Sequence, residues 1–416
     1  MRARLEQLLD RLRTGFWFVP SLMIGLAIVF ALLLLWVDGK VDPGINASLA
    51  WAYSGGPEGA RSLLSTIAGS MITAASVTFS LASVAISIAS QQYGSRVLRN
   101  FMRDRVTQFL LGTFVSTFVY SVLVVRSIRG SDFSGGFVPS IAVTGAIALS
   151  LVSLVLLVYF VHHVSTSIQA SHIISVIAQD LKKSIPALYP SASGEQSHKE
   201  PVLGAIRALP RLSISKKKSG YIQSVDLGSL LEIAESNDIV IEVVVKPGDH
   251  TIVGNDLAVA LGDRMILKED QKRLADAFVI GDQRTSLQDI RFRFQQLTDV
   301  IVRALSPGIN DPFTAINAID ALATAASQLA RRPRVPEVRY DSSGTVRLIV
   351  ATAHFEEILK DTVGHIALYA ERDPFVVRSL RRVLQTVEPD LMGGRERRTL
   401  TELNADLDRQ EIFKGS

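Results

Sequence analysis

SLLSTIAGSMITAASVTFSLASVAISIAS, residues 62–90, contains no charged side chain and is long enough to cross a bilayer, yet eleven of its residues are Ser or Thr. At about 100° per residue, ten of these hydroxyls fall within an arc of about 160°, and only Thr78 lies outside it. The apolar face of such a helix suits lipid or packed helices, whereas its hydroxyl face suits either a close helix–helix seam or water. The pattern predicts a membrane helix with two different kinds of neighbour.

Three further apolar runs predict three more spans, and each is long enough to cross about 30 Å of hydrocarbon. They cover residues 16–37, about 107–125 and about 139–161. Residues 14–160 are mostly apolar, whereas residues 180–416 carry most of the charged side chains. We therefore predict a membrane α-helical fold with four transmembrane helices, followed by a cytoplasmic α+β domain with a small β-sandwich and a helical part.

The distribution of arginine predicts the orientation of these spans. The loop at 38–60 carries one lysine against three carboxylates: Lys40, Asp38, Asp42 and Glu58. The N-terminal segment and the 91–106 loop carry four arginines each: Arg2, Arg4, Arg11, Arg13, Arg96, Arg99, Arg103 and Arg105. Positive loops stay in the cytoplasm. We therefore expect a multi-pass protein of the bacterial inner (plasma) membrane with cytoplasmic N- and C-termini.

Composition argues against several classes of function. The net charge of +4 in 416 residues, with no dense basic stripe, does not indicate a nucleic-acid partner. The absence of cysteine excludes disulfides, thiol catalysis and thiolate metal sites. No nucleophile–base pattern, metal-ligand motif or phosphate-binding glycine motif stands out. We expect no enzyme activity, no cofactor and no metal.

The hydroxyl stripe leads to two alternative functions. In the first, the protein is an oligomeric channel or permeation protein with a cytoplasmic regulatory domain, surrounded by lipid and built from identical copies. The predicted pore-lining residues are Thr66, Ser70, Thr73, Ser76, Ser80, Ser83 and Ser87, and the predicted inner mouth is Arg96, Arg99 and Arg103. In the second, the protein is a non-conducting membrane scaffold or signalling protein, and the stripe is a helix-packing seam.

Histidines mark the inner end of the fourth span. His162 and His163 are adjacent, so their side chains diverge by about 100° on a helix, which disfavours a shared metal. Histidine at this position suits a group that senses pH or lipid at the membrane interface. We predict His162 and His163 as an interface sensor.

The soluble half divides by its composition. Predicted boundaries are a four-span transmembrane domain at 1–180, a β-rich subdomain at 181–265, a helical subdomain at 266–390 and a polar C-terminal tail at 391–416. The stretch 221–262, in which a β-branched strand precedes a Lys-Pro-Gly-Asp turn, resembles the repeats of lipoyl- and biotinyl-type sandwiches. It has no lysine at a hairpin tip, so the resemblance implies a fold and no carrier activity.

The loop Ser306-Pro307-Gly308-Ile309-Asn310-Asp311-Pro312 is the most unusual soluble segment. Its prolines and glycine suit a corner between two helices, and Asp311 and Pro312 suit the start of the second helix. The alternative is a pocket for a small anionic ligand. The residues predicted for that pocket are Asp289, Arg303, Asn310, Asp311 and Asp320.

Several phrases of the chain together resemble one bacterial family, the predicted membrane proteins called domain of unknown function 2254. They are FWFVP (16–20), SLLSTIAGSMI (62–72), SRVLRNFMRDR (95–105), LLGTFVSTFVY (110–120), YFVHH (159–163), SGYIQ (219–223) and RALSPGINDPFTAI (303–316). The resemblance covers nearly the whole chain. It implies a four-span inner-membrane protein with a cytoplasmic C-terminal domain, and it implies no activity.

Overall fold

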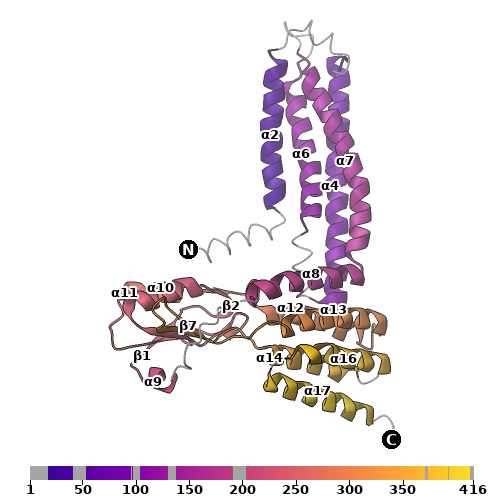
Figure 1. Cartoon of the computed structure of the whole chain (residues 1–416). Coiled ribbons are helices and arrows are strands. Elements are labelled where there is room, and N and C mark those ends of the chain that lie inside the picture. The colour runs from indigo at the N-terminus through magenta and orange to yellow at the C-terminus, as the bar shows by residue number, and fades with distance from the viewer. Residues whose placement is uncertain are drawn as a thin grey trace. The chain divides into compact units, whose positions relative to one another are not determined.

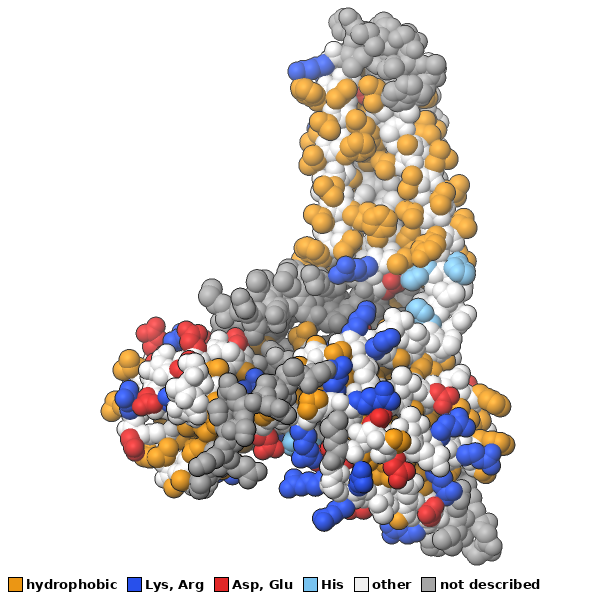
Figure 2. Space-filling view, viewed as in Figure 1, with side chains coloured by type: hydrophobic (Ala, Val, Ile, Leu, Met, Phe, Trp, Pro, Cys, Tyr) orange, Lys and Arg blue, Asp and Glu red, His pale blue; other side chains and the backbone are white. Residues whose placement is uncertain are grey.

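The computed structural model describes residues 17–40, 53–94, 96, 104–129, 137–190, 203–370, 373–391 and 393–412. The chain forms two compact units, one ending at Gln169 and the other continuing from Ala170 (Figure 1). We call them the membrane unit and the soluble unit. In Figure 2, hydrophobic side chains cover the visible face of the membrane unit, whereas charged side chains are frequent on the soluble unit.

The described residues of the membrane unit form four long helices, and the four predicted spans are confirmed as helices apolar enough to cross a membrane. They are α2 (Phe18–Asp38), α4 (Pro57–Tyr93), α6 (Arg105–Ser127) and α7 (Ser140–Ser167). Pro57 occupies the first turn of α4, where its missing N–H costs no helical hydrogen bond. Helix α4 has 37 residues, which exceeds what a bilayer requires.

Helix α6 is the central helix of the membrane unit, because it packs against α2, α4 and α7. Its small and polar residues face inward. Those buried are Thr107, Gln108, Gly112, Thr113, Ser116, Thr117 and Ser121. At Gly112 an added Cβ would lie 3.2 Å from the Cα of Pro20 and 2.5 Å from the sulfur of Met23. The hydroxyls of α6 therefore belong to a close-packed seam within one chain.

The soluble unit begins with helix α8 (Ala170–Leu188) and contains two sheets. The five-stranded sheet has the order β1-β5-β3-β8-β7, and only its β3–β8 pair is parallel. The three-stranded antiparallel sheet has the order β4-β2-β6. The strands are β1 (Arg211–Ser215), β2 (Gly220–Val225), β3 (Val240–Val243), β4 (His250–Thr251), β5 (Asp256–Leu261), β6 (Phe278–Gly281), β7 (Val338–Tyr340) and β8 (Val346–Val350).

Apolar residues from both sheets share one core. Ile222 of β2, Ile241 of β3 and Phe278 of β6 are all fully buried in it. Short helix α9 (Leu203–Arg207) precedes the first strand, and α10 (Leu227–Asn237) and α11 (Lys268–Asp276) connect later strands. The core of this region therefore draws on strands far apart in the sequence.

Helices of 5 to 19 residues and two short turns make up the rest of the described soluble unit. They are α12 (Ile290–Ala304), α13 (Pro312–Ala330), α14 (Phe355–Leu359), the π-turn η1 (Lys360–Gly364), α15 (His365–Ala370), α16 (Pro374–Val387), the 3₁₀ turn η2 (Glu388–Asp390) and α17 (Gly394–Ile412). Helix α13 packs against α8, α12 and α16. The sequence therefore gives an α+β unit, as expected.

The structure differs from the predicted subdivision in three places. The membrane unit ends at Gln169 and not at residue 180. Strands β6, β7 and β8 follow residue 265, so the sheets include residues from the segment predicted as helical. The segment predicted as a polar tail contains α17. Leu400, Leu403 and Leu407 are buried along one face of this helix, at the three- and four-residue spacing of an amphipathic helix.

Candidate functional site

The predicted pore-lining residues lie on the outside of the membrane unit. Thr66, Ser70, Thr73, Ser76, Ser80, Ser83 and Ser87 are all exposed. The buried face of α4 is formed by Ala60, Leu64, Ile67, Ala68, Ala75, Thr78, Ala85 and Ala89. At about 100° per residue, the centres of these two faces are about 180° apart. The hydroxyl stripe therefore lies opposite the side on which α4 packs against α6 and α7.

Most hydroxyls of the stripe donate hydrogen bonds within their own helix. The acceptor is the carbonyl four residues earlier, at 2.8 Å for Thr66 and Thr73, 2.7 Å for Ser70 and 2.9 Å for Ser76 and Ser83. These bonds use the donors and leave the oxygen lone pairs free on the exposed face. The stripe is thus an acceptor surface that tolerates both water and a close neighbour.

Apolar side chains flank the hydroxyl stripe on both sides. Ile72 and Phe79 lie along one edge, and Leu81 lies along the other; all are exposed. Gly69 lies within the stripe, and an added Cβ there would meet no atom within 4 Å. Among the described residues of the membrane unit, no other helix covers this face. A mainly polar stripe, interrupted by the exposed Val77 and Val84 and bordered by apolar side chains, is therefore available to a partner.

Of the predicted inner-mouth arginines, the structure describes one. Arg96 follows α4 and is exposed. Arg99 and Arg103 lie outside the described residues. The inner mouth stays a prediction.

The two predicted sensor histidines differ in their surroundings. His162 is exposed, whereas Nε2 of His163 lies 2.7 Å from Oδ2 of Asp104. The ring of Tyr159 stacks on His163 at a centroid distance of 6.0 Å. Asp104 also caps α6, because its Oδ1 accepts a hydrogen bond from the Val106 N–H at 3.0 Å. The sequence reasoning missed Asp104, although an aspartate just before an apolar run is an N-cap signal.

A second carboxylate lies at the opposite end of the bundle, where the end of α2 meets the start of α7. Both oxygens of Asp38 accept backbone hydrogen bonds, from Ile141 at 3.0 Å and Ala142 at 2.9 Å. Asp38 is buried, and the Tyr120 hydroxyl donates to the Ala142 carbonyl at 2.8 Å. The orientation argument counted Asp38 only as a loop charge. No local pattern indicated its capping role, because the N–H groups that bind Asp38 belong to α7, 103 and 104 residues later in the chain.

The five residues predicted as a ligand pocket do not meet at one place. Asp289 precedes α12, whereas Arg303 lies in the last turn of that helix and Asn310 and Asp311 follow it. Helix α12 has 15 residues, so at 1.5 Å per residue its ends are about 22 Å apart. Asp320 lies farther along α13 and is exposed. The length of α12 therefore separates Asp289 from Arg303, Asn310 and Asp311.

The SPGINDP loop forms a corner between α12 and α13. Asp311 accepts a hydrogen bond from the Thr314 N–H at 3.1 Å, and hydrogen bonds from Thr314 lower the pKa of this carboxyl. Asp373 precedes Pro374 and caps α16 in the same way, through Phe375 and Val376. The repeated Asp-Pro-Phe start favours a structural role for this loop.

Asp289 instead lines a cavity of about 260 Å³ in the soluble unit. Its side chain is 2% exposed, and Oδ2 accepts hydrogen bonds from Nη2 of Arg284 at 2.6 Å and from Nε at 3.0 Å. Burial raises the pKa of the Asp289 carboxyl, and Arg284 opposes that change. Three cations line the same cavity: Lys246, Arg291 and Arg339.

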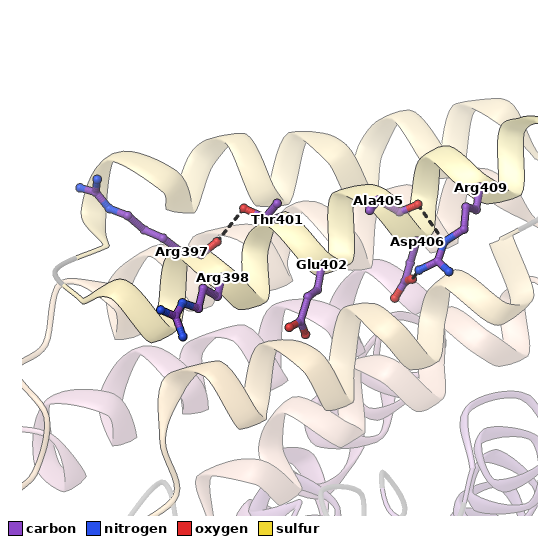
Figure 3. Close-up of a pocket in the computed structure, with 7 residues that line it drawn as sticks. All are labelled: Arg397, Arg398, Thr401, Glu402, Ala405, Asp406 and Arg409. Carbon is purple, nitrogen blue, oxygen red and sulfur yellow. Dashed lines mark hydrogen bonds and ion pairs between the residues drawn. The ribbon is translucent and has the colours of Figure 1, made fainter.

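Figure 3 shows a second hollow, on the exposed face of α17. All seven of its lining residues come from this one helix, and three of its charged side chains, Glu402, Asp406 and Arg409, form ion pairs. Glu402 pairs with Lys360 at 3.3 Å, and Asp406 pairs with Arg409. Exposed pairs of this kind are typical of a solvated helix face, and we assign no ligand to it.

Comparisons with known proteins agree with the membrane fold. A family model described as "Predicted membrane protein (DUF2254)" matches residues 13–386. Uncharacterised proteins of Mycobacterium bovis and Mycobacterium tuberculosis are each 31% identical over 394 residues, which cover 93% of this chain and 74% of theirs. No solved structure matches the chain significantly.

Proposed function

We propose that this chain, which belongs to the DUF2254 family of predicted membrane proteins, is the subunit of a homo-oligomeric channel in the bacterial inner membrane. In this proposal α4 lines the permeation path, and the soluble unit is a cytoplasmic regulatory domain. Both termini then face the cytoplasm, as the distribution of arginine in the sequence suggests.

The observation that supports the proposal most strongly is the exposed hydroxyl stripe of α4. Within one chain the stripe faces away from the other three spans, so lipid, water or another copy must contact it. Lipid gives no hydrogen bonds to the free lone pairs of Thr73 or Ser80, and it suits the flanking Phe79 and Leu81 better. A ring of copies with α4 innermost would place the stripe at the shared axis and the apolar borders between subunits.

The chemistry of such a path would be neutral along its length. The span at 62–90 contains no charged residue, so hydroxyl oxygens and backbone would contact the permeating species. Arginines at the inner end, of which Arg96 is exposed, would add positive potential there. This arrangement favours weak selectivity within the span and enrichment of anions at the cytoplasmic mouth.

A non-conducting scaffold is the second candidate, and the internal hydrogen bonds of the stripe favour it. Because Thr66, Ser70 and Ser83 already donate to their own helix, they could pack against a second copy without water. Gly69 would allow close approach of two such helices. Both candidates are oligomers, and they differ in whether water fills the space along the shared axis.

Ion flux in liposomes tests the proposal directly. We expect Thr73→Leu to reduce the flux of the reconstituted protein strongly, because the leucine would place an apolar side chain in the path. Leu154→Phe is the matched control, because Leu154 is exposed on α7 and belongs neither to the stripe nor to its apolar borders. It adds bulk to another span and should leave flux intact. Equal effects of the two substitutions, or no flux from the wild-type protein, would contradict conduction.

A further inference from the structure

The cavity beside Asp289 lies where four segments of the soluble unit come together. These are the end of α8, the turn after β3, the start of α12 and the segment after β8, and Leu227 at the start of α10 and Val335 and Arg339 in the segment through β7 complete the wall. The turn lies close to the carboxylate: a Cβ added to Gly248, whose φ is +94°, would lie 2.0 Å from Oδ2 of Asp289. Only glycine permits both that backbone conformation and that approach. The backbone of Gly248 therefore packs directly against the Asp289 carboxylate in the wall of the cavity.

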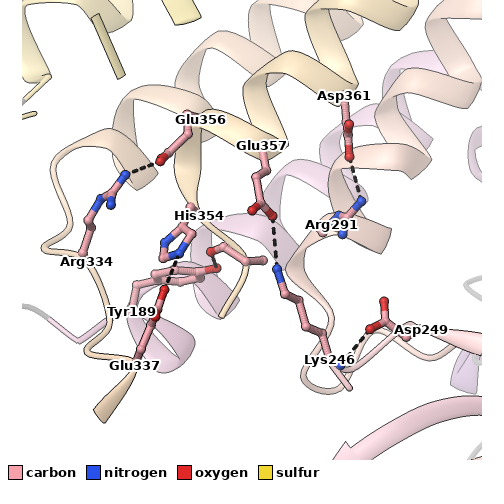
Figure 4. A network of polar contacts seen from close by, with 11 residues as sticks. Tyr189, Lys246, Asp249, Arg291, Arg334, Glu337, His354, Glu356, Glu357 and Asp361 are labelled. Atoms are coloured by element: carbon pink, nitrogen blue, oxygen red, sulfur yellow. Dashed lines mark hydrogen bonds and ion pairs between the residues drawn. The ribbon is translucent and has the colours of Figure 1, made fainter. Parts of the chain in front are cut away.

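Two of the cations that line the cavity are more buried than the carboxylates that neutralise them. Lys246 is 25% exposed and lies 3.3 Å from Glu357, which is 42% exposed. Arg291 is 32% exposed and lies 2.8 Å from Asp361, which is 47% exposed. Figure 4 shows both cations extending toward the helical segment that carries these carboxylates. Each pair thus places its positive end nearer the cavity than its negative end.

Two donors at the cavity have no acceptor. Nε of Arg291 and Oγ1 of Thr352 are buried, and neither forms a hydrogen bond with a described residue. A buried donor without an acceptor is costly. An oxygen-rich anion is the kind of group that would satisfy both.

The third cation, Arg339, forms no ion pair with any described carboxylate. The carboxylate in the cavity wall, Asp289, does not serve as its partner, because Oδ2 binds Arg284 and Oδ1 accepts from the Phe292 N–H at 3.0 Å. The cavity therefore has more positive charge than its own residues neutralise.

We propose that this cavity binds a small organic anion, a carboxylate or phosphate monoester on a compact apolar body. Arg339, Arg291 and Thr352 would bind its oxygens. Leu227, Val335 and Val350, which also line the cavity, would contact the apolar body. The cavity volume of about 260 Å³ lies below the roughly 300–1,000 Å³ of sites for drug-sized ligands, so the ligand should be smaller than a drug-sized molecule. The inference does not depend on conduction through α4.

Calorimetric titration of the full chain tests the proposal, in a detergent free of phospholipid so that lipid headgroups do not compete. The probes are phenyl phosphate, benzoate and benzyl alcohol. We expect millimolar or tighter binding of at least one anion and no binding of the alcohol, which has the same apolar body without charge. Binding of only one anion identifies the headgroup chemistry. Binding of neither anion, or equal binding of the alcohol, overturns the proposal.

Substitution of the unpaired arginine locates the site. Arg339→Gln should weaken anion binding roughly tenfold, as expected for loss of one charge-assisted contact. Arg264→Gln is the control, because Arg264 is 67% exposed, pairs with Asp238 and does not line the cavity. Both arginines are at the surface, so folding should be preserved and is verified by the unfolding temperature. Binding by Arg339→Gln equal to that of the wild type would place the anion elsewhere and overturn the assignment.

Discussion

Thr73 and Thr78 lie on opposite faces of α4, one exposed and the other 1% exposed. The hydroxyl of Thr73 donates to the Gly69 carbonyl at 2.8 Å, whereas Oγ1 of Thr78 is buried without a partner. Thr78 is also the one hydroxyl that the helical spacing placed outside the stripe. Thr73 therefore lies on the face of α4 that no described span covers, and Thr78 lies on the face that packs against α6 and α7.

Thiol labelling distinguishes a hydroxyl stripe that faces water from one that packs against another copy of the chain. The chain contains no cysteine, so a single substitution gives an unambiguous probe. We expect Ser80→Cys, in reconstituted protein, to react with a water-soluble, membrane-impermeant maleimide, because the reactive thiolate forms in water. Phe79→Cys, on the apolar border, should react much more slowly. Slow reaction at both positions, with an efficient Ser80→Cys disulfide between copies, would favour the scaffold instead.

Thr78→Val should stabilise the membrane unit. The substitution keeps the shape of the side chain and removes a buried hydroxyl that has no hydrogen-bond partner, so we expect a gain of about 1 kcal/mol in unfolding free energy. The measurement is unfolding of the full chain in mixed micelles with increasing SDS. Thr107→Val is the matched control, because Thr107 donates to Asp104 at 2.6 Å, and its loss should destabilise the protein. A change of the same sign in both variants would contradict this account.

The spans were predictable from the sequence because length and hydropathy are local properties. The stripe of α4 and the hydroxyls of α6 look alike in sequence, but they differ in environment: Ser121 is fully buried and Ser80 is exposed. Which hydroxyl-rich helix becomes the centre of the bundle depends on how all four spans pack. Helical spacing identifies a face and does not show what covers it.

In the soluble unit, long-range pairing limited the prediction. The β-branched strand β3 was evident, but its parallel partner β8 begins about 100 residues later. The grouping of Asp289 with Asp311 failed for a related reason. Both are helix N-caps with similar local signals, and the helix between them sets their distance. Local patterns therefore indicated the elements and not which residues meet.

Asp38 should stabilise the membrane unit through the backbone of α7. Asp38→Ala removes both acceptors of the Ile141 and Ala142 N–H groups, and we expect a loss of about 1–2 kcal/mol. Asp38→Asn keeps one acceptor oxygen and should fall between Ala and the wild type. The same SDS titration measures the order. An alanine variant as stable as the wild type would show that water replaces the cap.

The contact of His163 with Asp104 should stabilise the membrane unit. A double-mutant cycle with His163→Ala and Asp104→Ala isolates their coupling from the capping role of Asp104. We expect coupling of about 0.5–1 kcal/mol, as for a partly exposed polar pair. The loss of stability in Asp104→Ala should exceed the loss in His163→Ala, because Asp104 also caps α6. Additive losses in the double variant would contradict a stabilising contact between the two side chains.

Asp341, in the turn between β7 and β8, should make the soluble unit sensitive to acid. Its carboxylate accepts hydrogen bonds from the Ser343 hydroxyl at 2.6 Å, from Arg347 at 2.8 Å and from the Thr345 N–H at 2.9 Å. These contacts hold the pKa of Asp341 well below its usual range. In the unfolded chain the pKa of the same carboxyl is about 3.9. Its contribution to stability is therefore complete above that value and is lost as the pH falls toward the lower pKa of the folded state.

We expect Asp341→Asn to lower the unfolding temperature of the full chain at neutral pH, and the difference from the wild type to shrink below about pH 4. Asp263→Asn is the control, because Asp263 is exposed and forms no ion pair among the described residues; it should show no such trend. A difference at Asp341 that stays constant into acid would mean that the turn depends on side-chain shape and not on the charge of the carboxylate.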